Sequence, residues 1–515
     1  MQGVIRYFIL ICLAGTVVSC QGSDKGMEDR PDILLILVDD MGWSDIGCYG
    51  GEISTPNLDS LAYQGIRFTQ FHNTSKCFPS RACLLTGVYA QQCGYDRSFS
   101  QPIAHAVTLG EVLQTAGYRT LWSGKHHGIE NPVTRGFYRY YGLRDGACNH
   151  FNPGIQRPGE GVPAQKPGPS HRIWCIDDSL VSPYTPPSDF YTTDYFTNHA
   201  LEWLDQYGPD SQPLFLFMAY TAPHDPLMAW PEDIGKYRDM YSVGYETIRE
   251  ARTARQLEMG LIDGRFKLSV PSFPAWSSLD PETQKTEALK MAVYAAMIDR
   301  VDQNIGRILA KIRELGRDQH TLILFMSDNG SSAEVVKIPG EGEIGSLTRW
   351  TSLGGDWANV SNTPFRYFKN YSHEGGICTP LIAYWPDGIP EGGRVSDFCG
   401  HFVDIMPTLA EISGAGYPST FKGDSITPMQ GLSLLPILKG EKLLRQEPLC
   451  WQWSQGKAIR EGRWKLVAFG EEAEWELYDM DTDLTETRNL SDSYPEIVKD
   501  LAGKWEAWSA EYSAR

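Results

Sequence analysis

DILLILVDD, residues 32–40, places six consecutive apolar residues directly before two aspartates. An uninterrupted apolar run of this length is typical of a β-strand that is buried on both faces of a largely parallel sheet. Similar runs recur at 118–124, 213–220, 321–327 and 380–385. Helical patterns lie between the runs, at 55–65, 108–117 and 292–315. The alternation predicts an α/β fold in which helices sandwich a largely parallel central sheet.

Polar and charged residues follow the C-terminal ends of four of these runs. They are Asp39 and Asp40, Lys125 to His127, His224, and Asp328 and Asn329. In open α/β sheets the ligand crevice lies outside the carboxyl ends of the strands. We therefore expect these residues, which are distant in sequence, to meet at one site.

The first group of these side chains offers only oxygen ligands, which suit a hard cation such as calcium or magnesium. Its members are Asp39, Asp40, Asp328 and Asn329. Three adjacent carboxylates would repel one another, and a metal ion is the simplest way to hold them together. A single pair of this kind is more often a helix cap or a turn. Two pairs that follow two buried strands favour the metal site.

The second group can bind an anion and transfer protons. Lys125 and His127 alternate, so their side chains would share one face of an extended segment. Lysine binds anionic oxygens, and histidine moves protons near neutral pH. His224 adds a second histidine, in APHDP at 222–226. A packed or purely structural role is the alternative for each histidine.

A cysteine opens the next informative stretch, CFPSRACLLTG at 77–87. Pro79 suits the first position of a helix, which would place Cys77 close to the positive end of the helix dipole. Cys77 could be half of a disulfide with Cys83 or Cys93, or a thiolate nucleophile activated by a base. A thiolate beside a hard, oxygen-ligated metal would be a chemical mismatch.

Charge and cysteine content narrow the classes of partner. The 515 residues carry a net charge of -18, so nucleic acid and acidic membrane surfaces are poor partners. Two of the 11 cysteines, Cys12 and Cys20, lie near the N-terminus, and the remaining ones permit disulfides in an oxidising compartment. The absence of a CxxC pair argues against a structural zinc site.

The first 20 residues are typical of an export signal, because Arg6 precedes an apolar run that is too short to span a bilayer. Val17 to Cys20 resemble the lipobox of a bacterial lipoprotein, and residues 21–30 suit a flexible tether. We expect an exported lipoprotein of a Gram-negative bacterium, in the periplasm or at the outer membrane, whose only membrane contact is a lipid anchor. An ordinary signal peptide is the alternative.

Several motifs together resemble the sulfatase family of the alkaline phosphatase superfamily. Cys77-Phe78-Pro79-Ser80-Arg81, followed by LLTG at 84–87, resembles the family signature. The motifs DD, GKHH, APHDP and SDNG accompany it in the family's order. The resemblance covers nearly the whole mature chain, including NTPFRYFKNYSHEGGICTP at 362–380.

The resemblance implies that a formylglycine-generating maturation enzyme oxidises Cys77, and that the hydrated aldehyde is the nucleophile. It implies that Ca²⁺, with Mg²⁺ as the alternative, is bound by Asp39, Asp40, Cys77, Asp328 and Asn329.

The resemblance also assigns roles to the basic residues. Arg81 would orient the formylglycine, and Lys125 and Lys369 would neutralise the sulfate. His127 would handle the formylglycine proton, and His224 would protonate the leaving oxygen. One departure is His126, where the family commonly has tryptophan, and we expect it to affect only local packing.

The implied activity is the hydrolysis of sulfate esters with release of inorganic sulfate. We expect an exo-acting enzyme on sulfated glycans of mucin or glycosaminoglycan type, with sulfated galactose or N-acetylgalactosamine as the terminal sugar. The alternatives are a phosphonate monoester hydrolase or phosphodiesterase of the same superfamily, and a non-catalytic glycan-binding relative.

The domain organisation follows from these motifs and from a change of pattern near residue 436. Residues 31–435 are predicted to form the alkaline phosphatase-like catalytic domain. Residues 436–515 show short polar and apolar alternation and an amphipathic end, which predict a smaller α+β subdomain with an antiparallel sheet. The Pro- and Gly-rich stretches 144–190 and 337–357 are predicted to be functional loops.

Overall fold

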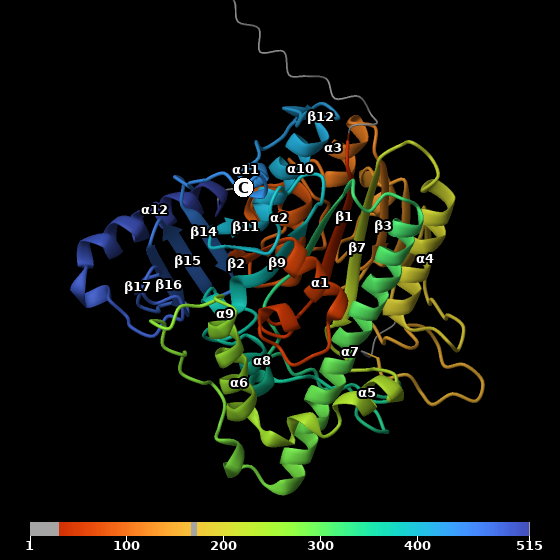
Figure 1. Ribbon diagram of the computed structural model, residues 1–515, viewed down its shortest axis with the longest axis horizontal. Coiled ribbons are helices and arrows are strands. Elements are labelled where there is room, and N and C mark those ends of the chain that lie inside the picture. Colours follow the sequence, from red (N-terminus) through yellow and green to blue (C-terminus); the bar gives the residue numbers. More distant parts are fainter. Residues whose placement is uncertain (1–29, 166–171, 514–515) are drawn as a thin grey trace, which may run out of the picture.

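Strand β1, Asp32–Asp39, lies near the middle of the central sheet (Figure 1). A computed structural model of the chain describes residues 30–165 and 172–513. β1 pairs in parallel with β7 (Leu214–Pro223) on one side and with β8 (Thr321–Ser327) on the other. Every residue of these three strands is buried, which explains their uninterrupted apolar sequences.

Eleven strands of the described chain form this sheet, in the order β10-β2-β9-β8-β1-β7-β3-β4-β5-β6, with β11 beside β2. The strands not yet bounded are β2 (Ile66–His72), β3 (Arg119–Gly124), β4 (Arg139–Leu143), β5 (Trp174–Ile176), β6 (Ser179–Val181), β9 (Cys378–Tyr384), β10 (Arg394–Ser396) and β11 (Gly400–His401). The strands from β8 to β4 are parallel to one another. The predicted run at 380–385 falls largely in β9, which is antiparallel to both of its neighbours, β2 and β8.

Helices cover both faces of the sheet, because alternate side chains of a strand point to opposite faces. Leu34 and Ile36 pack in the core under α1, α4 and α7, whereas Leu35 and Leu37 pack under α2, α3 and α10. The bounds are α1 (Pro56–Gln64), α2 (Cys77–Thr86), α3 (Leu109–Thr115), α4 (Thr192–Tyr207), α7 (Pro281–Glu314) and α10 (Ile405–Ser413). Figure 1 shows α4 and α7 lying along one face. The predicted sandwich is confirmed.

The C-terminal part forms a separate antiparallel sheet, which confirms the predicted α+β subdomain. Its strands are β14 (Leu449–Trp453), β15 (Gly456–Glu461), β16 (Trp464–Phe469) and β17 (Glu476–Asp479). Helix α12 (Pro495–Ser513) packs on this sheet through Leu501, which contacts Ile459 and Leu466 in a small core. The proposed boundary near residue 436 falls within the short helix α11 (Leu435–Leu438) and stays a prediction.

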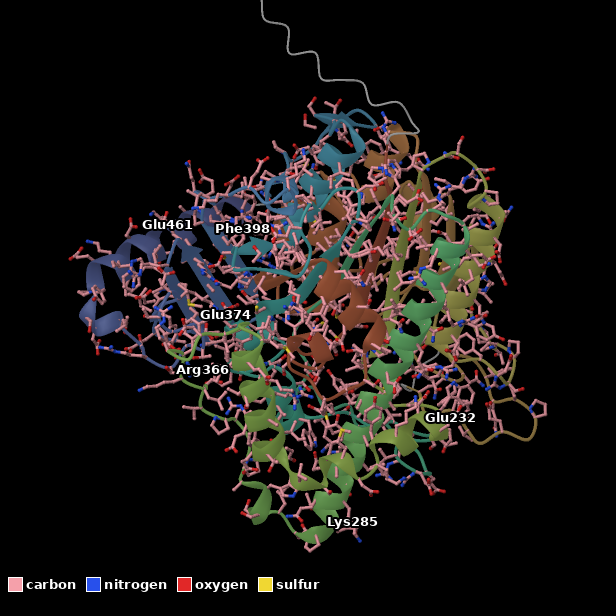
Figure 2. All side chains as sticks on the ribbon, in the orientation of Figure 1. Glu232, Lys285, Arg366, Glu374, Phe398 and Glu461 are labelled. Atoms are coloured by element: carbon pink, nitrogen blue, oxygen red, sulfur yellow. The ribbon has the colours of Figure 1, made fainter. Side chains whose placement is uncertain are left out.

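A buried lysine joins the two sheets. Lys465 on β16 lies 2.6 Å from Glu374 on α9 (Glu374–Ile377) and 2.7 Å from Glu486. All three side chains are fully buried. Figure 2 labels Glu374 at the junction between the α/β body and the C-terminal sheet, whereas Glu461 lies on the C-terminal side.

We expect Lys465→Met to lower the free energy of unfolding by about 3–5 kcal/mol, because it leaves two carboxylates buried without their ammonium partner. Urea denaturation measures the loss. Lys504→Met is the matched control, since Lys504 pairs with Glu461 at 2.7 Å but both side chains are more than a third exposed. That change should cost no more than about 1 kcal/mol. Equal losses in the two variants would contradict the role assigned to Lys465.

The nine cysteines that the structure describes are free thiols, so the disulfides that their number permitted do not form. Cys83 and Cys93 are packed in the core beneath α2 and α3. Among the described helices, none is long and apolar enough to cross a membrane. The predicted signal peptide and all of the tether before residue 30 lie outside the described residues.

Candidate active site

The carboxyl ends of β1 and β8 bring four oxygen-bearing residues together. Val38 and Ser327 are register partners, so the residues that follow them are neighbours. The backbone N–H of Asp40 lies 3.3 Å from Asp328 Oδ1, and Asn329 Nδ2 lies 2.6 Å from Asp40 Oδ1. Asp40 has a φ of 66°, a left-handed conformation that turns the chain immediately after the strand.

The donor set of this cluster fits a hard cation. Asp39 Oδ1 and Asn329 Oδ1 are buried, and neither has a hydrogen-bond donor within the described part of the chain. Buried acceptors are normally paired, so these two oxygens are suited to a metal ligand role. Burial and the neighbouring Asp39 carboxylate raise the pKa of Asp328 above its ordinary value. A bound cation would relieve this crowding of negative charge.

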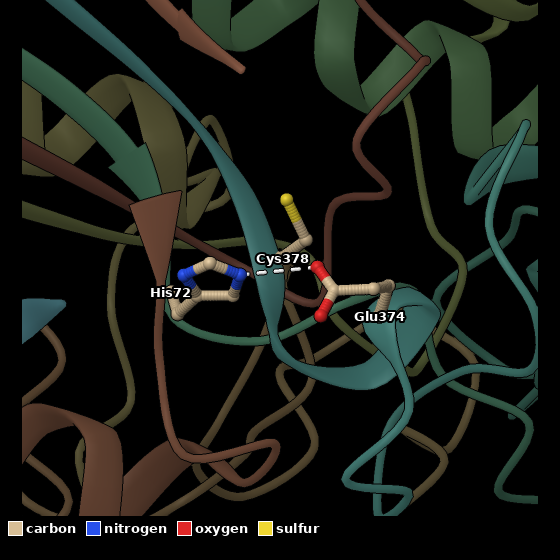
Figure 3. A group of neighbouring side chains, drawn as sticks. All are labelled: His72, Glu374 and Cys378. Carbon is tan, nitrogen blue, oxygen red and sulfur yellow. Dashed lines mark hydrogen bonds and ion pairs between the residues drawn. The ribbon is translucent and has the colours of Figure 1, made fainter. Parts of the chain in front are cut away.

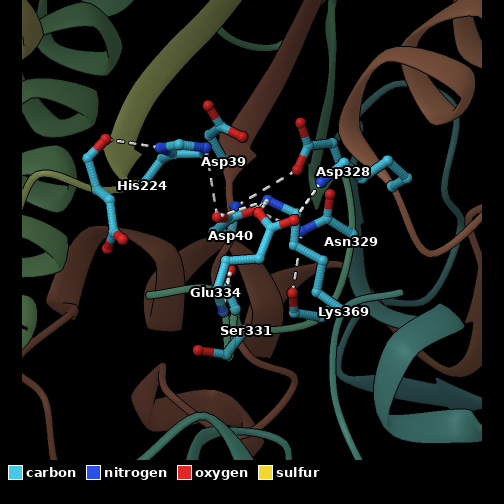
Figure 4. A network of polar contacts seen from close by, with 12 residues as sticks. Asp39, Asp40, His224, Asp328, Asn329, Ser331, Glu334 and Lys369 are labelled. Atoms are coloured by element: carbon cyan, nitrogen blue, oxygen red, sulfur yellow. Dashed lines mark hydrogen bonds and ion pairs between the residues drawn. The ribbon is translucent and has the colours of Figure 1, made fainter. Parts of the chain in front are cut away.

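Three basic side chains contact these carboxylates, and Figure 4 shows one of them, Lys369, beside Asp40. Lys125 Nζ lies 2.5 Å from Asp39 Oδ2, and Lys369 Nζ lies 2.7 Å from Asp40 Oδ1. Arg81 Nε donates to Asp328 Oδ2 at 2.8 Å, and its Nη1 donates to the carbonyl oxygen of Lys125 at 3.1 Å. All of these side chains are buried, so the positive charges are held rigidly beside the oxygen cluster.

Cys77 is the first residue of α2, two residues earlier than the placement of Pro79 at the helix start had suggested. Pro79 is tolerated there because the first helical turn has no intrahelical partner for its N–H groups. Cys77 is 2% exposed. Burial raises the pKa of its thiol above the usual range, although Lys125 and Lys369 oppose the shift. The thiol is therefore protonated near neutral pH, which disfavours the hypothesis of a thiolate nucleophile.

Arg81 lies one helical turn beyond Cys77 on α2, a spacing that puts both side chains on the same face. The ion pair of Arg81 with Asp328 therefore fixes this face of the helix against the oxygen cluster.

His224 follows β7 and faces the same cluster. Its Nδ1 lies 2.7 Å from the carbonyl oxygen of Asp225, which can only accept, so Nδ1 carries a hydrogen. Nε2 is then the atom that gains or loses a proton, and it lies 3.6 Å from Asp40 Oδ2. Burial lowers the pKa of His224 to about 3, with Lys369 and Lys125 assisting and Asp40 opposing.

The segment that carries Lys125 and His127 is not extended, contrary to the geometry assumed from their alternation. Strand β3 ends at Gly124, and His127 has a φ of 64°. The His127 ring packs edge-on against Phe99 with centroids 4.6 Å apart. Burial, followed by the charges of Lys125 and Arg81, holds the pKa of His127 well below its ordinary value, which keeps it neutral. His126 turns away and packs against Trp122, with centroids 5.1 Å apart.

Three residues of the site region were not found by sequence reasoning. Lys76 Nζ lies 2.5 Å from Glu334 Oε1, and Glu334 Oε2 lies 3.2 Å from Lys369 Nζ. His150, from the insertion at 144–190, has its Nε2 3.0 Å from the carbonyl oxygen of His224 and positions that segment. The proximity of Glu334 to SDNG and of Lys76 to Cys77 in sequence was the available signal.

The C-terminal subdomain holds two loops of the site in place. Trp451 Nε1 donates to the carbonyl oxygen of Asn73 at 2.8 Å, and Trp453 Nε1 donates to Asn370 Oδ1 at 2.9 Å. Asn73 lies on the segment before Cys77, and Asn370 follows Lys369 directly. Strand β14 therefore fixes the approach of both loops.

A second group of side chains has ligand-type atoms close together but already engaged (Figure 3). His72 Nε2 lies 3.0 Å from Glu374, and His72 Nδ1 lies 2.9 Å from the carbonyl oxygen of Gly400. The other carboxylate oxygen of Glu374 accepts from Lys465. Burial lowers the pKa of His72, but Glu374 and Cys399 together outweigh it and the net result is a pKa of about 9. This group is an ion pair of the junction, with Cys378 beside it.

Residues 31–415 match the family model described as Sulfatase. The chain belongs to the sulfatase family. Residues 364–511 of this sulfatase also match the model for the C-terminal part of N-sulphoglucosamine sulphohydrolase. Membership makes the protein a sulfuric ester hydrolase with the expected alkaline phosphatase-like architecture.

Two relatives illustrate the similarity. An arylsulfatase of Klebsiella aerogenes is 33% identical over 460 residues, which cover 82% of this sulfatase and 95% of the relative. An N-acetylgalactosamine-6-sulfatase of Canis lupus familiaris is 27% identical and covers 90% of this sulfatase and 77% of the relative.

Solved structures agree on the fold. A protein solved in complex with its substrate D-glucosamine-2-N,6-O-disulfate superposes with a TM-score of 0.64 at 21% identity, covering 94% of this chain and 99% of that one. A phosphonate monoester hydrolase of Agrobacterium radiobacter gives a TM-score of 0.62 at 20% identity, covering 94% and 96%. The fold alone therefore does not separate these activities.

Proposed function

We propose that this sulfatase uses a formylglycine at position 77 to remove sulfate from a glycan. The observation that carries the proposal is the placement of Cys77 at the start of a buried helix, within electrostatic reach of Lys125, Lys369 and Asp328. An unmodified thiol with a raised pKa has no evident use there, whereas an oxidised residue would face two ammonium groups and an oxygen cluster.

The aldehyde, once hydrated, would supply one hydroxyl to attack sulfur and a second whose deprotonation releases the sulfate. Calcium, or magnesium in its place, would be held by Asp39, Asp40, Asp328, Asn329 and residue 77, and would supply Lewis acidity. Asp39 Oδ1 and Asn329 Oδ1, which accept no hydrogen bond from the described residues, support this assignment.

The side chains of the chain itself then have separate tasks. Lys125 and Lys369 are placed to bind the sulfate oxygens and to stabilise the charge that develops on them. Arg81 keeps Asp328 and the Lys125 backbone in position through its hydrogen bonds and so orients residue 77. His127, whose ring packs against Phe78 and Phe99, would exchange a proton with residue 77.

His224 would donate from Nε2 to the oxygen of the leaving alcohol. An anionic ester bound beside Lys125 and Lys369 would offset the two ammonium charges that help to keep the pKa of His224 low. Substrate binding would therefore favour the protonated histidine that the departure of the alcohol requires.

The mass of the tryptic peptide Cys77–Arg81 tests the mechanism, since trypsin cleaves after Lys76 and after Arg81. Conversion to formylglycine should lower this mass by about 18 Da, through loss of sulfur and two hydrogens and gain of oxygen. Fully active protein with an unmodified thiol would overturn the proposal.

We further propose a sulfated glycan of mucin or glycosaminoglycan type, cleaved from its end, with sulfated galactose or N-acetylgalactosamine as the terminal sugar. A cavity of about 760 Å³, whose walls include both predicted loop insertions but none of the proposed site residues, would receive sugars beyond the sulfate. Phe151 and Trp230 line it and offer aromatic faces. Met228 lies four residues after His224 in the sequence. It forms an isolated β-bridge with Gly345, which lines the cavity.

A panel of defined sulfated mono- and oligosaccharides tests the substrate. Release of sulfate from terminal sugars is expected. Hydrolysis of aryl sulfates with no release from any glycan would overturn the glycan proposal. Faster turnover of phosphonate or phosphate diesters than of the matched sulfate ester would favour a phosphonate monoester hydrolase or phosphodiesterase.

We also propose export as a lipoprotein, on the basis of residues 1–20 and the cysteine at position 20. Cys20→Ala is expected to release the protein from the membrane fraction of an expressing Gram-negative cell into its soluble periplasm. Unchanged membrane association would contradict the lipid anchor.

A further inference from the structure

Glu334 lies beside Lys369 (Figure 4) and forms ion pairs with two lysines. Its Oε1 lies 2.5 Å from Lys76 Nζ and its Oε2 lies 3.2 Å from Lys369 Nζ. Asn370 Nδ2 also donates to Oε1, at 3.2 Å. The Glu334 side chain is 39% exposed, whereas Lys369 is completely buried. Glu334 is thus a solvent-exposed partner of the buried Lys369.

The three aspartates of the oxygen cluster differ from Glu334 in exposure and in partners. Asp39 and Asp328 side chains are 0% exposed and Asp40 is 4% exposed. All four carboxylates are paired with basic side chains, but the aspartates also belong to the proposed metal site, whereas Glu334 does not. Glu334 therefore adds negative charge beside the sulfate-binding lysines without a place among the metal ligands.

The charge of the bound anion determines how strongly the Glu334 carboxylate opposes its binding. A sulfate monoester carries one negative charge, whereas a phosphate monoester above its second pKa of about 6 carries two. The inorganic sulfate that hydrolysis produces also carries two. By Coulomb's law, a fixed carboxylate beside the anion site repels a dianion about twice as strongly as a monoanion.

We propose that Glu334 is a specificity-determining residue that makes the site accept monoanionic sulfate esters and reject dianions. The same carboxylate excludes phosphate monoesters and promotes release of the sulfate product. The inference rests on the proposed function, because it assumes that Lys369 contacts the anion. A purely structural Glu334, which only orients Lys76 and Lys369, would act through its length and not its charge, so Glu334→Asp would shift the preference as Glu334→Gln does.

Calorimetric titration of Glu334→Gln tests the charge effect without requiring turnover. The two probes are inorganic sulfate, a dianion, and sulfamate, a monoanion of similar shape, added to the calcium-loaded protein at about pH 8. We expect the affinity for sulfate to rise about tenfold more than the affinity for sulfamate. In turnover of 4-nitrophenyl esters, kcat/KM for phosphate relative to sulfate should rise by a similar factor.

Two controls separate charge from structure. Glu334→Asp keeps the charge and should keep the preference of the wild type for the monoanion. Glu341→Gln removes one negative charge from an exposed position on the segment that follows Glu334, and should change neither ratio; Glu341 makes no ion pair within the described residues. An unchanged ratio of sulfate to sulfamate affinity in folded Glu334→Gln protein overturns the inference. Wild-type protein that hydrolyses no sulfate ester overturns the proposed function instead.

Discussion

Replacing Cys77 by alanine is expected to abolish sulfate ester hydrolysis, with kcat lowered by at least about 10³-fold. Alanine has no sulfur to oxidise, so neither the attacking hydroxyl nor the second hydroxyl can form. Alanine also favours the helical conformation, and the substitution removes only the thiol group, so the melting temperature should change little. Steady-state kinetics with a matched preparation of the wild type measures the loss.

Cys83→Ala is the matched control, since Cys83 lies on the same helix and is also fully buried. Once its folded fraction is accounted for, this variant should hydrolyse sulfate esters at the wild-type rate. Activity retained in Cys77→Ala would show that the nucleophile is another group.

Removal of Asp328, a proposed metal ligand, has the second-largest expected effect. Asp328→Ala should weaken calcium binding by more than about 100-fold, because loss of a direct ligand exceeds the effect of losing an outer partner. It also deprives Arg81 of its 2.8 Å acceptor and so disturbs the helix that carries residue 77. Calorimetry with calcium gives the affinity, and kcat/KM should fall in parallel.

Chelation of the wild type is the corresponding test without a mutation. Activity should disappear with EDTA and return on addition of calcium. Asp263→Ala, at an exposed position, is the control and should bind calcium as the wild type does. Full activity of chelated, metal-free protein would refute the metal assignment.

The central strands were predictable because burial on both faces leaves a run with almost no polar residue, as in β1. β2 escaped notice because Arg67, Thr69 and Gln70 interrupt its apolar sequence, although the strand is almost entirely buried, second from one end of the sheet. The direction of β9 was also hidden, since an apolar run has no sign that distinguishes parallel from antiparallel pairing. The start of α2 was misplaced by two residues because proline is acceptable throughout the first helical turn.

The site residues after β1, β3, β7 and β8 could be predicted together because parallel neighbouring strands end at one edge. Lys76 and Glu334 could not, since they are 258 residues apart and meet only through the paths of two loops. The contribution of Trp451 and Trp453 was equally invisible, because it depends on how the C-terminal sheet docks.

The burial of Cys77 has a consequence for the order of events in biosynthesis. At 2% exposure, the thiol is out of reach of the catalytic centre of any second protein once the chain has folded. The segment before Cys77 is held by a hydrogen bond from Trp451. The ribosome synthesises Trp451 hundreds of residues after Cys77. We expect oxidation of Cys77 to be confined to the interval in which the nascent chain is still open, so that folding ends the opportunity for maturation.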